Sequence, residues 1–437
     1  MRIHFIGIGG IGLSALAKFL AKQGYEISGS DIAQSEITDD LALNYGIKIN
    51  IPHHADAVEG ADLVIHSAVV KPNNVEYKRA KELGIEVISR KEALKFILKD
   101  YEVYAVAGAH GKSTTSAILA SIIPKSNALI GAISKEFGSN VRYYPNKKVV
   151  FEADESDASF LNSNPYLAIV TNVEKEHMEY YNYDEELFFN TYEKFINLAK
   201  LKVLNQDDPW LNQKKFDAIY LSPKDDIKNI EYQLIDDEPY ISFELKDFGK
   251  FKVYGFGEHI ALDASLAILA AVALGEDIED IRKNILNYKG IKKRFDIIYK
   301  DEDVAIVDDY GHHPTEIKAT LKALRKYMEL KGLKNLHVIW QPHKYTRTID
   351  NLSGFVEAFK GVDTLVILPI WAAGEIEIPI DLKGAFSSYN PIMADRIKRE
   401  GNIVKVIKDS APIEVFKKGL IVAFGAGDIT YQIRGEK

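Results

Sequence analysis

The sequence predicts an α/β fold with more than one domain, and three observations support this prediction. The chain has 437 residues and 46% apolar content, which is more than one ordinary hydrophobic core accommodates, so two or three domains are expected. Short runs rich in β-branched residues alternate with helical patterns, which is typical of parallel sheets with crossover helices. Two glycine-rich loops each lie between a strand pattern and a helix pattern.

The composition argues against several classes of protein. A net charge of -8 argues against a nucleic-acid-binding surface. No stretch approaches the ~20 apolar residues that a membrane span needs. The chain has no cysteine, which excludes disulfides, thiolate metal sites and cysteine nucleophiles. The opening MRIHFIGIGGIG has a glycine-rich turn where a signal peptide has an unbroken apolar run, so we expect a cytoplasmic protein.

The first hundred residues predict alternating strands and helices. Residues 2–8 form a strand pattern that leads into a glycine turn. A helix follows, because apolar residues recur there at helical spacing: Leu13, Leu16, Ala17 and Leu20. Further strands are expected at 25–30 and 62–66, and helices at 75–83 and 90–99.

A second unit is expected from residue 101 to residue 290. It opens with a strand at 104–107, a glycine-rich loop and a helix that runs to about Ile123. The other expected strands are 148–152, 166–171 and 200–205. Residues 207–250 are poor in helix signals, whereas 259–274 predict a strong helix.

A third unit is expected from residue 291 to residue 437, after a first unit of residues 1–100. Its expected elements are a strand at 304–309, a helix at 313–330, and strands at 335–340 and 363–368. The chain closes with a strand that runs into a glycine turn at 419–428.

The first glycine loop, Gly7-Ile-Gly-Gly-Ile-Gly12, matches the G-x-G-x-x-G pattern between a strand and a helix. Glycines at these positions allow a tight turn and let a diphosphate approach the helix N-terminus. Asp31 ends the next strand, about 20 residues on, where a ribose-binding acid is expected. NAD and a UDP-sugar both present a diphosphate and a ribose, so both ligands fit the motif; the alternative is a tight turn without a ligand.

The second glycine loop, Gly108-Ala-His-Gly-Lys-Ser-Thr-Thr, is the strongest local signal. Its backbone N–H groups can wrap phosphates, Lys112 can neutralise their oxygens, and the Ser113 hydroxyl can bind Mg²⁺. The loop departs from the common G-x-x-x-x-G-K-[ST] form, because Val106 stands where the first glycine is usual. A generic helix start does not account for Gly-Lys-Ser-Thr directly after a strand.

An acidic segment, 151–157, follows a predicted strand and is a candidate metal site. Mg²⁺ takes oxygen ligands, and one or two carboxylates beside ATP phosphates are sufficient. Glu152 lies closest to the strand and is the first candidate; the alternative is a solvated acidic loop. His177, at the end of TNVEKEH, is either a metal ligand, a phosphate contact or an ordinary polar residue.

Two further loops rich in polar residues follow strands of the third unit. Residues 308–316 (DDYGHHPTE) join a strand to a helix, and both Pro314 and Glu316 suit a first helical turn. Residues 341–347 (QPHKYTR) follow the next strand. Both loops can face a ligand at one sheet edge; the alternative for the histidines is a helix cap with satisfied polar contacts. Arg294, in the expected linker, can reach phosphates or be solvated.

Taken together, these motifs resemble the Mur ligases over essentially the whole chain. Seven segments match in order: FIGIGGIG, AGAHGKSTT, EADESDASFL, TNVEKEH, KRFD, DDYGHHPTE and PHKYTR. The last two distinguish the chain from the related ligase that recycles murein tripeptide.

The resemblance implies three domains: an N-terminal Rossmann-like domain for UDP, a central P-loop-type ATPase domain, and a C-terminal Rossmann-like domain that brings the amino acid. It implies an ATP-dependent ligase of bacterial wall synthesis that forms an amide between the lactyl carboxylate of UDP-N-acetylmuramate and L-alanine. The reaction would pass through an acyl phosphate and release ADP and phosphate. Mg²⁺ is the implied metal, and we expect a monomer or homodimer with no nucleic-acid or membrane partner.

The resemblance also assigns residues. For ATP it implies Gly108, Ala109, His110, Gly111, Lys112, Ser113, Thr114, His259, Arg294 and Asp309. For Mg²⁺ it implies Ser113, Glu152 and His177. For the sugar nucleotide the candidates are Gly9, Gly10, Gly12, Asp31 and Ser67, and for L-alanine Tyr310, His312, His343, Lys344 and Arg347. The residues expected to act in catalysis are Lys112, His177, Arg294, His312, His343 and Arg347.

The chain departs from the family pattern at three positions. Ile260 and Asp263 stand where the family usually has asparagine, and Ile260 cannot hydrogen-bond adenine through its side chain. Lys344 replaces an arginine and cannot form a bidentate fork with a carboxylate, although Arg347 can. His312 and His343 are both candidates to take the amine proton.

Three other functions compete with this interpretation. An NAD-dependent oxidoreductase would explain the first glycine loop but not GAHGKST or the acidic segment. A nucleotide-binding regulator would bind ATP and form no amide. A ligase of the same family could use another amino acid or a peptide.

Overall fold

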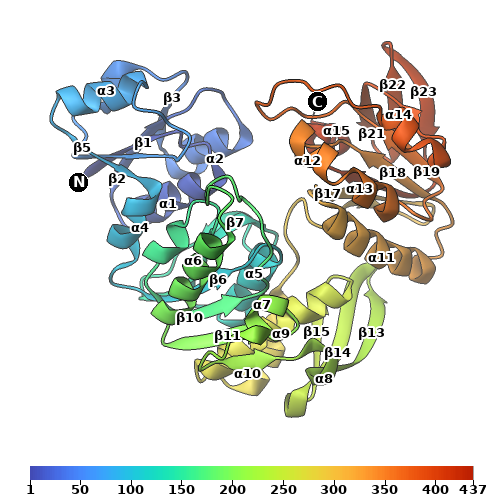
Figure 1. Ribbon diagram of the computed structural model, residues 1–437, viewed down its shortest axis with the longest axis horizontal. Helices are drawn as coiled ribbons and strands as arrows, with labels where there is room; N and C mark the ends of the chain where they lie inside the picture. The colour runs from blue at the N-terminus through green and yellow to red at the C-terminus, as the bar shows by residue number, and fades with distance from the viewer. Residues whose placement is uncertain (437) are drawn as a thin grey trace. The chain divides into compact units, whose positions relative to one another are not determined.

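The computed structural model describes residues 1–436 and confirms an α/β protein built on parallel sheets (Figure 1). The chain forms two compact units. The first contains Met1–Lys228, Glu244–Phe251 and Leu262–Lys289. The second contains Asn229–Phe243, Lys252–Ala261 and the described residues from Gly290 onward.

The N-terminal part of the first unit holds a five-stranded parallel sheet. Its strands are β1 (Arg2–Ile6), β2 (Glu26–Ser30), β3 (Lys48–Asn50), β4 (Leu63–His66) and β5 (Glu86–Ser89), in the order β3-β2-β1-β4-β5. Its helices are α1 (Ile11–Lys22), α2 (Glu36–Tyr45), η1 (Ala55–Val58), α3 (Val75–Glu82) and α4 (Arg90–Leu98). Parallel strands end at one edge, so the loops after β1, β2, β4 and β5 meet there.

The two faces of this sheet are buried differently. One face packs Ile3, Phe5 and Ile65 against α1, in a hydrophobic core that continues into the central part of the chain. The other face has a small apolar cluster and a buried polar group, the Glu76 carboxylate of α3. This carboxylate accepts hydrogen bonds from His4 Nε2 (3.2 Å), the His54 N–H (2.8 Å) and the Ser30 hydroxyl. Glu76 therefore ties α3 to β1 and β2.

We expect the Glu76→Gln variant to lose about 2 kcal/mol of unfolding free energy at pH 7, because an amide cannot accept from all three donors. Burial raises the pKa of Glu76, but the hydrogen bonds from His4, Ser30 and His54 outweigh it and hold the pKa below 4.5. The charged form is thus favoured by folding, and its contribution is lost as the pH falls through the lowered pKa.

Urea unfolding of both proteins at pH 7 and near pH 4 checks this prediction. The difference between them should shrink at the lower pH. Glu82→Gln, on the exposed face of the same helix, should have no effect. A difference that stays constant with pH would contradict a charged Glu76.

The central part of the first unit is a seven-stranded sheet in the order β12-β11-β10-β6-β9-β7-β8, in which only β8 is antiparallel to its neighbour. The strands are β6 (Glu102–Ala107), β7 (Asn127–Ser134), β8 (Ser139–Arg142), β9 (Lys148–Glu152), β10 (Pro165–Val170), β11 (Leu201–Asn205) and β12 (Ile219–Leu221). The helices are α5 (Lys112–Ile122), η2 (Ser159–Asn162), α6 (Glu185–Leu198), α7 (Pro209–Gln213) and α8 (Pro223–Asp226). Because β6 lies between β9 and β10, the loops after all three strands share one edge of the sheet.

A three-stranded sheet and the long helix α9 come next in the chain, and each contains residues of both units. The sheet contains β13 (Ile227–Ile235), β14 (Glu238–Leu245) and β15 (Lys250–Tyr254). The helices are η3 (Lys246–Phe248), α9 (Glu258–Ala273), α10 (Ile278–Asn284) and η4 (Ile285–Asn287).

The C-terminal part has a six-stranded sheet in the order β16-β17-β24-β18-β19-β20. These strands are β16 (Asp296–Lys300), β17 (Val304–Asp309), β18 (Leu336–Trp340), β19 (Thr364–Ile367), β20 (Ile392–Met393) and β24 (Gly419–Phe424). The last strand, β24, lies between β17 and β18 and is parallel to both. The loops after β17 and β18 are therefore brought to the same edge.

The remaining C-terminal elements are a second, smaller sheet and several helices. An antiparallel sheet contains β21 (Arg396–Glu400), β22 (Ile403–Lys408) and β23 (Ala411–Phe416). The helices are α11 (Pro314–Lys331), α12 (Tyr345–Asp350), α13 (Leu352–Ala358), α14 (Leu382–Ala385), η5 (Ser387–Tyr389) and α15 (Ile429–Arg434). Among the described residues, every helix is too short or too polar to cross a membrane.

The structure differs from the sequence prediction in several elements. The strand predicted at 2–8 ends at Ile6, because the chain turns at Gly7 with a φ of +80°. Residues 207–250 contain strands β13 and β14, which the sequence did not predict. Helix α6 was also unpredicted, although Phe188, Tyr192 and Phe195 are buried at helical spacing. The strands β21 and β23 carry largely exposed residues that hide their period.

Candidate active site

The first glycine loop is held by hydrogen bonds to β2. The N–H groups of Gly7 and Ile8 donate to the Ser30 carbonyl at 2.9 and 3.0 Å. The Gly9 N–H donates to Asp31 Oδ2 at 2.7 Å, and a Cβ on Gly9 would lie 2.8 Å from that oxygen. Asp31, which the sequence predicts to bind a ribose, therefore also holds the first glycine loop in place. The N–H groups of Gly7, Ile8 and Gly9 thus donate to protein acceptors. The N–H groups of the first turn of α1 are the ones left to bind a ligand.

Ser67 follows β4 and lies against the same loop. Among the described residues its hydroxyl has no hydrogen-bond partner, although it is buried. A Cβ on Gly7 would lie 2.8 Å from this oxygen. The structure thus brings Ser67, Asp31 and the Gly7–Gly12 loop together, as the sequence predicts for a sugar-nucleotide site.

The second glycine loop joins β6 to α5 through two glycines in the left-handed region. Gly108 has a φ of +139° and Gly111 a φ of +84°. A Cβ on Gly108 would overlap the Thr171 hydroxyl, so only glycine fits there. The loop is fastened by Asn172, which accepts from the His110 N–H at 3.0 Å and donates to the His110 carbonyl at 2.9 Å.

Lys112 begins α5 and forms a buried ion pair with Glu155. Its ammonium lies 2.9 Å from Glu155 Oε1 and also donates to the Gly108 and Ala109 carbonyls. Burial lowers the pKa of Lys112, but the Glu155 and Glu152 carboxylates outweigh it, so the pKa is raised. Burial raises the pKa of Glu155. The sequence analysis includes Glu155 in the acidic segment but favours Glu152, because nothing in the spacing of Glu155 separates it from the other acids.

The acidic segment supplies two groups of candidate metal ligands. Ser113 Oγ donates to Glu152 Oε1 at 3.0 Å, and Glu152 Oε2 accepts the Gly131 N–H at 2.7 Å. His177 lies instead with Glu155 and Glu176, whose ligand atoms are all within 4.8 Å of one another. Glu155 Oε2 is buried and has no hydrogen-bond partner among the described residues. The hydroxyl and carboxylate oxygens of both groups are the donors that Mg²⁺ prefers.

A pocket of about 190 Å³ connects the two glycine loops. Its lining comes from the start of α1, the start of α4, the P-loop lysine and the strands around β9: Ile11, Gly12, Ala15, Leu16, Arg90, Leu94, Lys112, Leu129, Ile130, Gly131, Phe151, Glu152, Asp154 and Ser159. A ligand at the first loop and a ligand at the second loop would therefore share this pocket.

Asp263, which stands where the family usually has asparagine, lies against the second glycine loop. A Cβ on Gly111 would be 2.5 Å from Asp263 Oδ1. Ile260, one turn earlier on α9, is buried. His259 is half-buried, and burial lowers its pKa to about 4, so its ring is neutral at pH 7.

In the second unit, Asp309 holds the linker that carries Arg294. Asp309 accepts the Phe295 N–H at 2.7 Å and the Gly311 N–H at 2.8 Å. Burial raises its pKa to about 7. Arg294 Nη1 lies 3.9 Å from Glu316 Oε1. The structure thus brings together these two predicted nucleotide ligands and gives Asp309 a structural role as well.

The loops after β17 and β18 meet around the end of β24. The rings of His312 and His343 have centroids 6.0 Å apart, and Tyr310 lies 5.6 Å from His312. Arg347 Nη1 donates to His343 Nδ1 at 3.0 Å. Burial lowers the pKa of His343 to about 4, and Arg347, His312 and Lys344 act in the same direction.

Lys344 has a backbone conformation that is uncommon for a residue with a side chain. Its φ is +68°, and its N–H donates to the Trp371 carbonyl at 2.8 Å. Such strained positions cluster at ligand sites. The predicted alanine ligands Tyr310, His312, His343, Lys344 and Arg347 are thus assembled from two loops at one edge of the sheet.

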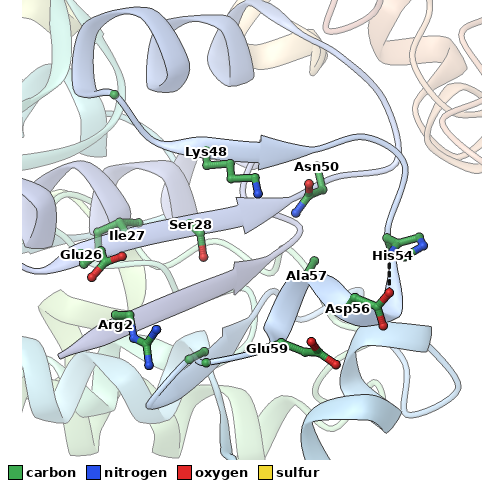
Figure 2. A pocket seen from close by; sticks show the side chains of 13 residues that line it. Arg2, Glu26, Ile27, Ser28, Lys48, Asn50, His54, Asp56, Ala57 and Glu59 are labelled. Carbon is green, nitrogen blue, oxygen red and sulfur yellow. Dashed lines mark ion pairs between the residues drawn. The ribbon is translucent and has the colours of Figure 1, made fainter.

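A larger pocket, of about 550 Å³, lies on the N-terminal sheet and contains none of the predicted site residues. Figure 2 shows that Arg2, Glu26 and Lys48 line it from the starts of β1, β2 and β3. His54, Asp56 and Glu59 line it from η1 and its flanks. Ligands of parallel sheets bind at the opposite, carboxyl ends of the strands, so this pocket is not the active site.

Models of one protein family match the chain in three consecutive segments. The model of the Mur ligase family, catalytic domain, matches residues 2–102. The Mur ligase middle domain model matches residues 106–271, and the model of the Mur ligase, glutamate ligase domain, matches residues 293–427.

Curated relatives are similar over the whole chain. The UDP-N-acetylmuramate–L-alanine ligase of Campylobacter curvus is 53% identical over 434 residues, which cover 99% of both chains. The enzyme of the same name from Helicobacter pylori is 53% identical over 438 residues and covers 100% of this chain and 96% of the relative.

Solved structures share the architecture. The UDP-N-acetylmuramate-alanine ligase of Thermotoga maritima superposes with a TM-score of 0.83 at 26% identity, over 99% of this chain and 97% of the other. A murein peptide ligase from Psychrobacter arcticus has a TM-score of 0.66 at 19% identity, over 100% and 99% of the chains, which shows the shared fold. These similarities confirm the predicted three-domain α/β architecture.

Proposed function

Because this chain belongs to the Mur ligase family, we propose that it joins L-alanine to the lactyl carboxylate of UDP-N-acetylmuramate, with ATP as the energy source. The observation that carries the proposal is 53% identity, across 99% of both chains, to a ligase named for these two substrates. The loops after β17 and β18, which bring the predicted alanine ligands together at the C-terminal sheet, also support it. The reaction serves peptidoglycan synthesis, in the cytoplasm, where the nucleotide substrates are found.

We assign one substrate to each part of the chain. Residues 1–100 bind the sugar nucleotide through the first glycine loop, Asp31 and Ser67. Residues 101–290 bind ATP through the second glycine loop. Residues 291–437 bind L-alanine, and the enzyme acts as a monomer or homodimer.

The chemistry explains why ATP is needed. A carboxylate is a poor acyl donor, because its leaving group would be oxide. Transfer of the γ-phosphoryl group to the carboxylate gives an acyl phosphate, and attack by the amine then releases phosphate as the leaving group. Phosphoryl transfer needs positioning and neutralisation of charge more than covalent help.

The P-loop side supplies that neutralisation. Lys112 would exchange Glu155 for phosphate oxygens, and Arg294 would contribute a second positive charge. Ser113 with Glu152, and His177 with Glu155, would hold Mg²⁺, and the metal would offset the negative charge of the phosphates.

Hydrogen-bond partners distinguish the two histidines as proton acceptors. Arginine can only donate, so His343 Nδ1 accepts from Arg347, and the neutral His343 ring carries its proton on Nε2. A carbonyl can only accept, so His312 Nδ1 donates to the Tyr310 carbonyl at 3.1 Å, and its lone pair is on Nε2. We therefore assign the amine proton to His312 Nε2, and to His343 a hydrogen bond to the carboxylate of alanine.

We expect His312→Asn to lower kcat about 100-fold, within the range for loss of a general base. The KM for ATP should stay unchanged. His343→Asn should mainly raise the KM for L-alanine. Because the pKa of His343 is about 4, its loss should not alter the pH profile of kcat between pH 6 and 9.

The pH profiles of both variants check this assignment. The base must be neutral to act, so wild-type kcat should fall at low pH, and His312→Asn should remove that fall. The reverse pattern, with the fall removed by His343→Asn, would exchange the two roles.

Phosphate release from Mg-ATP tests the proposed function itself. UDP-N-acetylmuramate should be present throughout, with each amino acid offered separately and the product identified by mass. Release that requires both the sugar nucleotide and L-alanine, with one amide product, is the expected result. Release with a different amino acid would keep the family and change the acceptor. No release with any acceptor would favour a nucleotide-binding regulator.

A further inference from the structure

Arg90 lies at the ligand edge of the N-terminal sheet, although no motif includes it. It is the first residue of α4 and follows β5 directly. Parallel strands end at one edge, so Arg90 shares that edge with the first glycine loop, Asp31 and Ser67. It also lines the pocket that connects the two glycine loops.

One side of the Arg90 guanidinium is held by the acidic segment. Nη2 lies 3.0 Å from Asp154 Oδ2 and 3.2 Å from Asp157 Oδ2, and donates to the Ser159 hydroxyl at 3.1 Å. The side chain is 19% exposed. The guanidinium is therefore charged and fixed in orientation.

The other side of the guanidinium faces the start of α1. A Cβ on Gly12 would lie 2.7 Å from Arg90 Nη1. The backbone of Gly12 does not have a positive φ, so any residue could adopt it. A side chain at position 12 would therefore have to displace the Arg90 guanidinium, whereas its backbone conformation would not be strained.

The same place is where a phosphate would be received. The N–H groups of Gly7, Ile8 and Gly9 are bonded to Ser30 and Asp31, so they do not point at a ligand. Helix α1 begins at Ile11 and has no side-chain cap. The first N–H groups of a helix have no partner within it, and together with the helix dipole they favour an anion. An anion there would lie beside Arg90 Nη1.

We propose that Arg90 binds the diphosphate of the sugar nucleotide at the N-terminus of α1, and that Gly12 is a glycine to admit its guanidinium. The assignment rests on the proposed function, which supplies the UDP-linked substrate. An arginine held by carboxylates at Nη2 presents its remaining N–H groups in a fixed fork, which suits phosphate oxygens. Lysine would keep the charge and lose the fork.

The test compares UDP with uridine as ligands of the Arg90→Lys variant, because only UDP carries the diphosphate. Affinities are measured by calorimetry, which does not depend on turnover. We expect about a tenfold weaker UDP affinity, the loss typical of one charge-assisted hydrogen bond, and an unchanged uridine affinity. Arg79→Lys is the matched control, since Arg79 lies on α3 of the same sheet and pairs with Glu59 and Glu82.

Gly12→Ala provides a second variant with an unchanged charge. Its methyl group should displace Arg90 and weaken UDP binding to a similar extent. The effects of Gly12→Ala and Arg90→Lys should not add in the double variant, because both act on one contact. Additive losses would overturn the steric role of Gly12.

The outcomes separate this inference from the proposed function. Equal losses for UDP and uridine, or a matching rise in the KM for ATP, would give Arg90 a structural role only. If Arg90→Lys left the UDP affinity unchanged but raised the KM for UDP-N-acetylmuramate, Arg90 would contact the lactyl carboxylate and not the diphosphate. That result would overturn the proposal. Wild-type protein that binds UDP but forms no amide would contradict the proposed function and leave the Arg90 contact intact.

Discussion

Replacement of Lys112 by methionine is expected to lower kcat for phosphate release about 1,000-fold. The ammonium lies at the start of α5, within the glycine loop that would hold the phosphates. Loss of one preorganised donor to a transition-state oxygen typically costs 100- to 1,000-fold, and here a full positive charge is lost as well. The sugar-nucleotide site contains other residues, so the affinity for UDP should be unchanged.

The same substitution is expected to destabilise the protein. Lys112 neutralises Glu155, whose side chain is 2% exposed. Removal of one partner from a buried ion pair leaves an uncompensated charge and costs about 3 kcal/mol. Urea unfolding measures this loss, and Lys125→Met, at an exposed position just after α5, is the control.

The double variant Lys112→Met, Glu155→Gln separates the two effects. Without the Glu155 charge, most of the unfolding free energy should return, because no buried carboxylate is left unpaired. Catalysis should not return. Recovery of activity in the double variant would mean that Lys112 serves only to neutralise Glu155 and does not contact the phosphates.

Arg434→Met is expected to lower the unfolding free energy of the C-terminal part by about 3–5 kcal/mol. Arg434 Nε lies 2.7 Å from Asp308 Oδ2, and its Nη2 pairs with Asp296. The Asp308 and Asp296 side chains are 1% and 5% exposed. Burial raises the pKa of Asp308, and Arg434 opposes that rise. Without Arg434, two buried carboxylates on adjacent strands would face each other.

Arg434 joins α15 to β17, the strand that leads into the loop with Tyr310 and His312. Asp308 also accepts from the Thr430 hydroxyl at 2.6 Å, and the next residue, Asp309, holds the Arg294 linker. Urea unfolding of Arg434→Met is compared with that of Arg396→Met, an exposed arginine on β21. The deficit should shrink at low pH, where the carboxylates become neutral. A loss below about 1 kcal/mol would mean that the carboxylates are neutral without Arg434.

The amino-acid sequence alone predicts the α/β class, the two glycine loops and the motif residues. These features depend on local spacing: a β-branched run, a glycine turn and a helical pattern are read within about 20 residues of one another. It also placed Ser113 near Glu152, since both follow strands, and the structure pairs them because β6 and β9 are adjacent. The sequence did not predict short or exposed strands such as β21 and β23, because they lack the alternation of buried and exposed residues by which a strand is recognised.

Which groups distant in the sequence meet is known only from the folded chain. Glu155 pairs with Lys112, Arg90 reaches Gly12, and Asp263 lies against Gly111, and none of these contacts has a sequence spacing that predicts it. The proton on each histidine was likewise open in the sequence. It follows from the partner of each ring, Arg347 for His343 and the Tyr310 carbonyl for His312. Charge compensation and hydrogen-bond direction depend on neighbours in space, which the folded chain alone brings together.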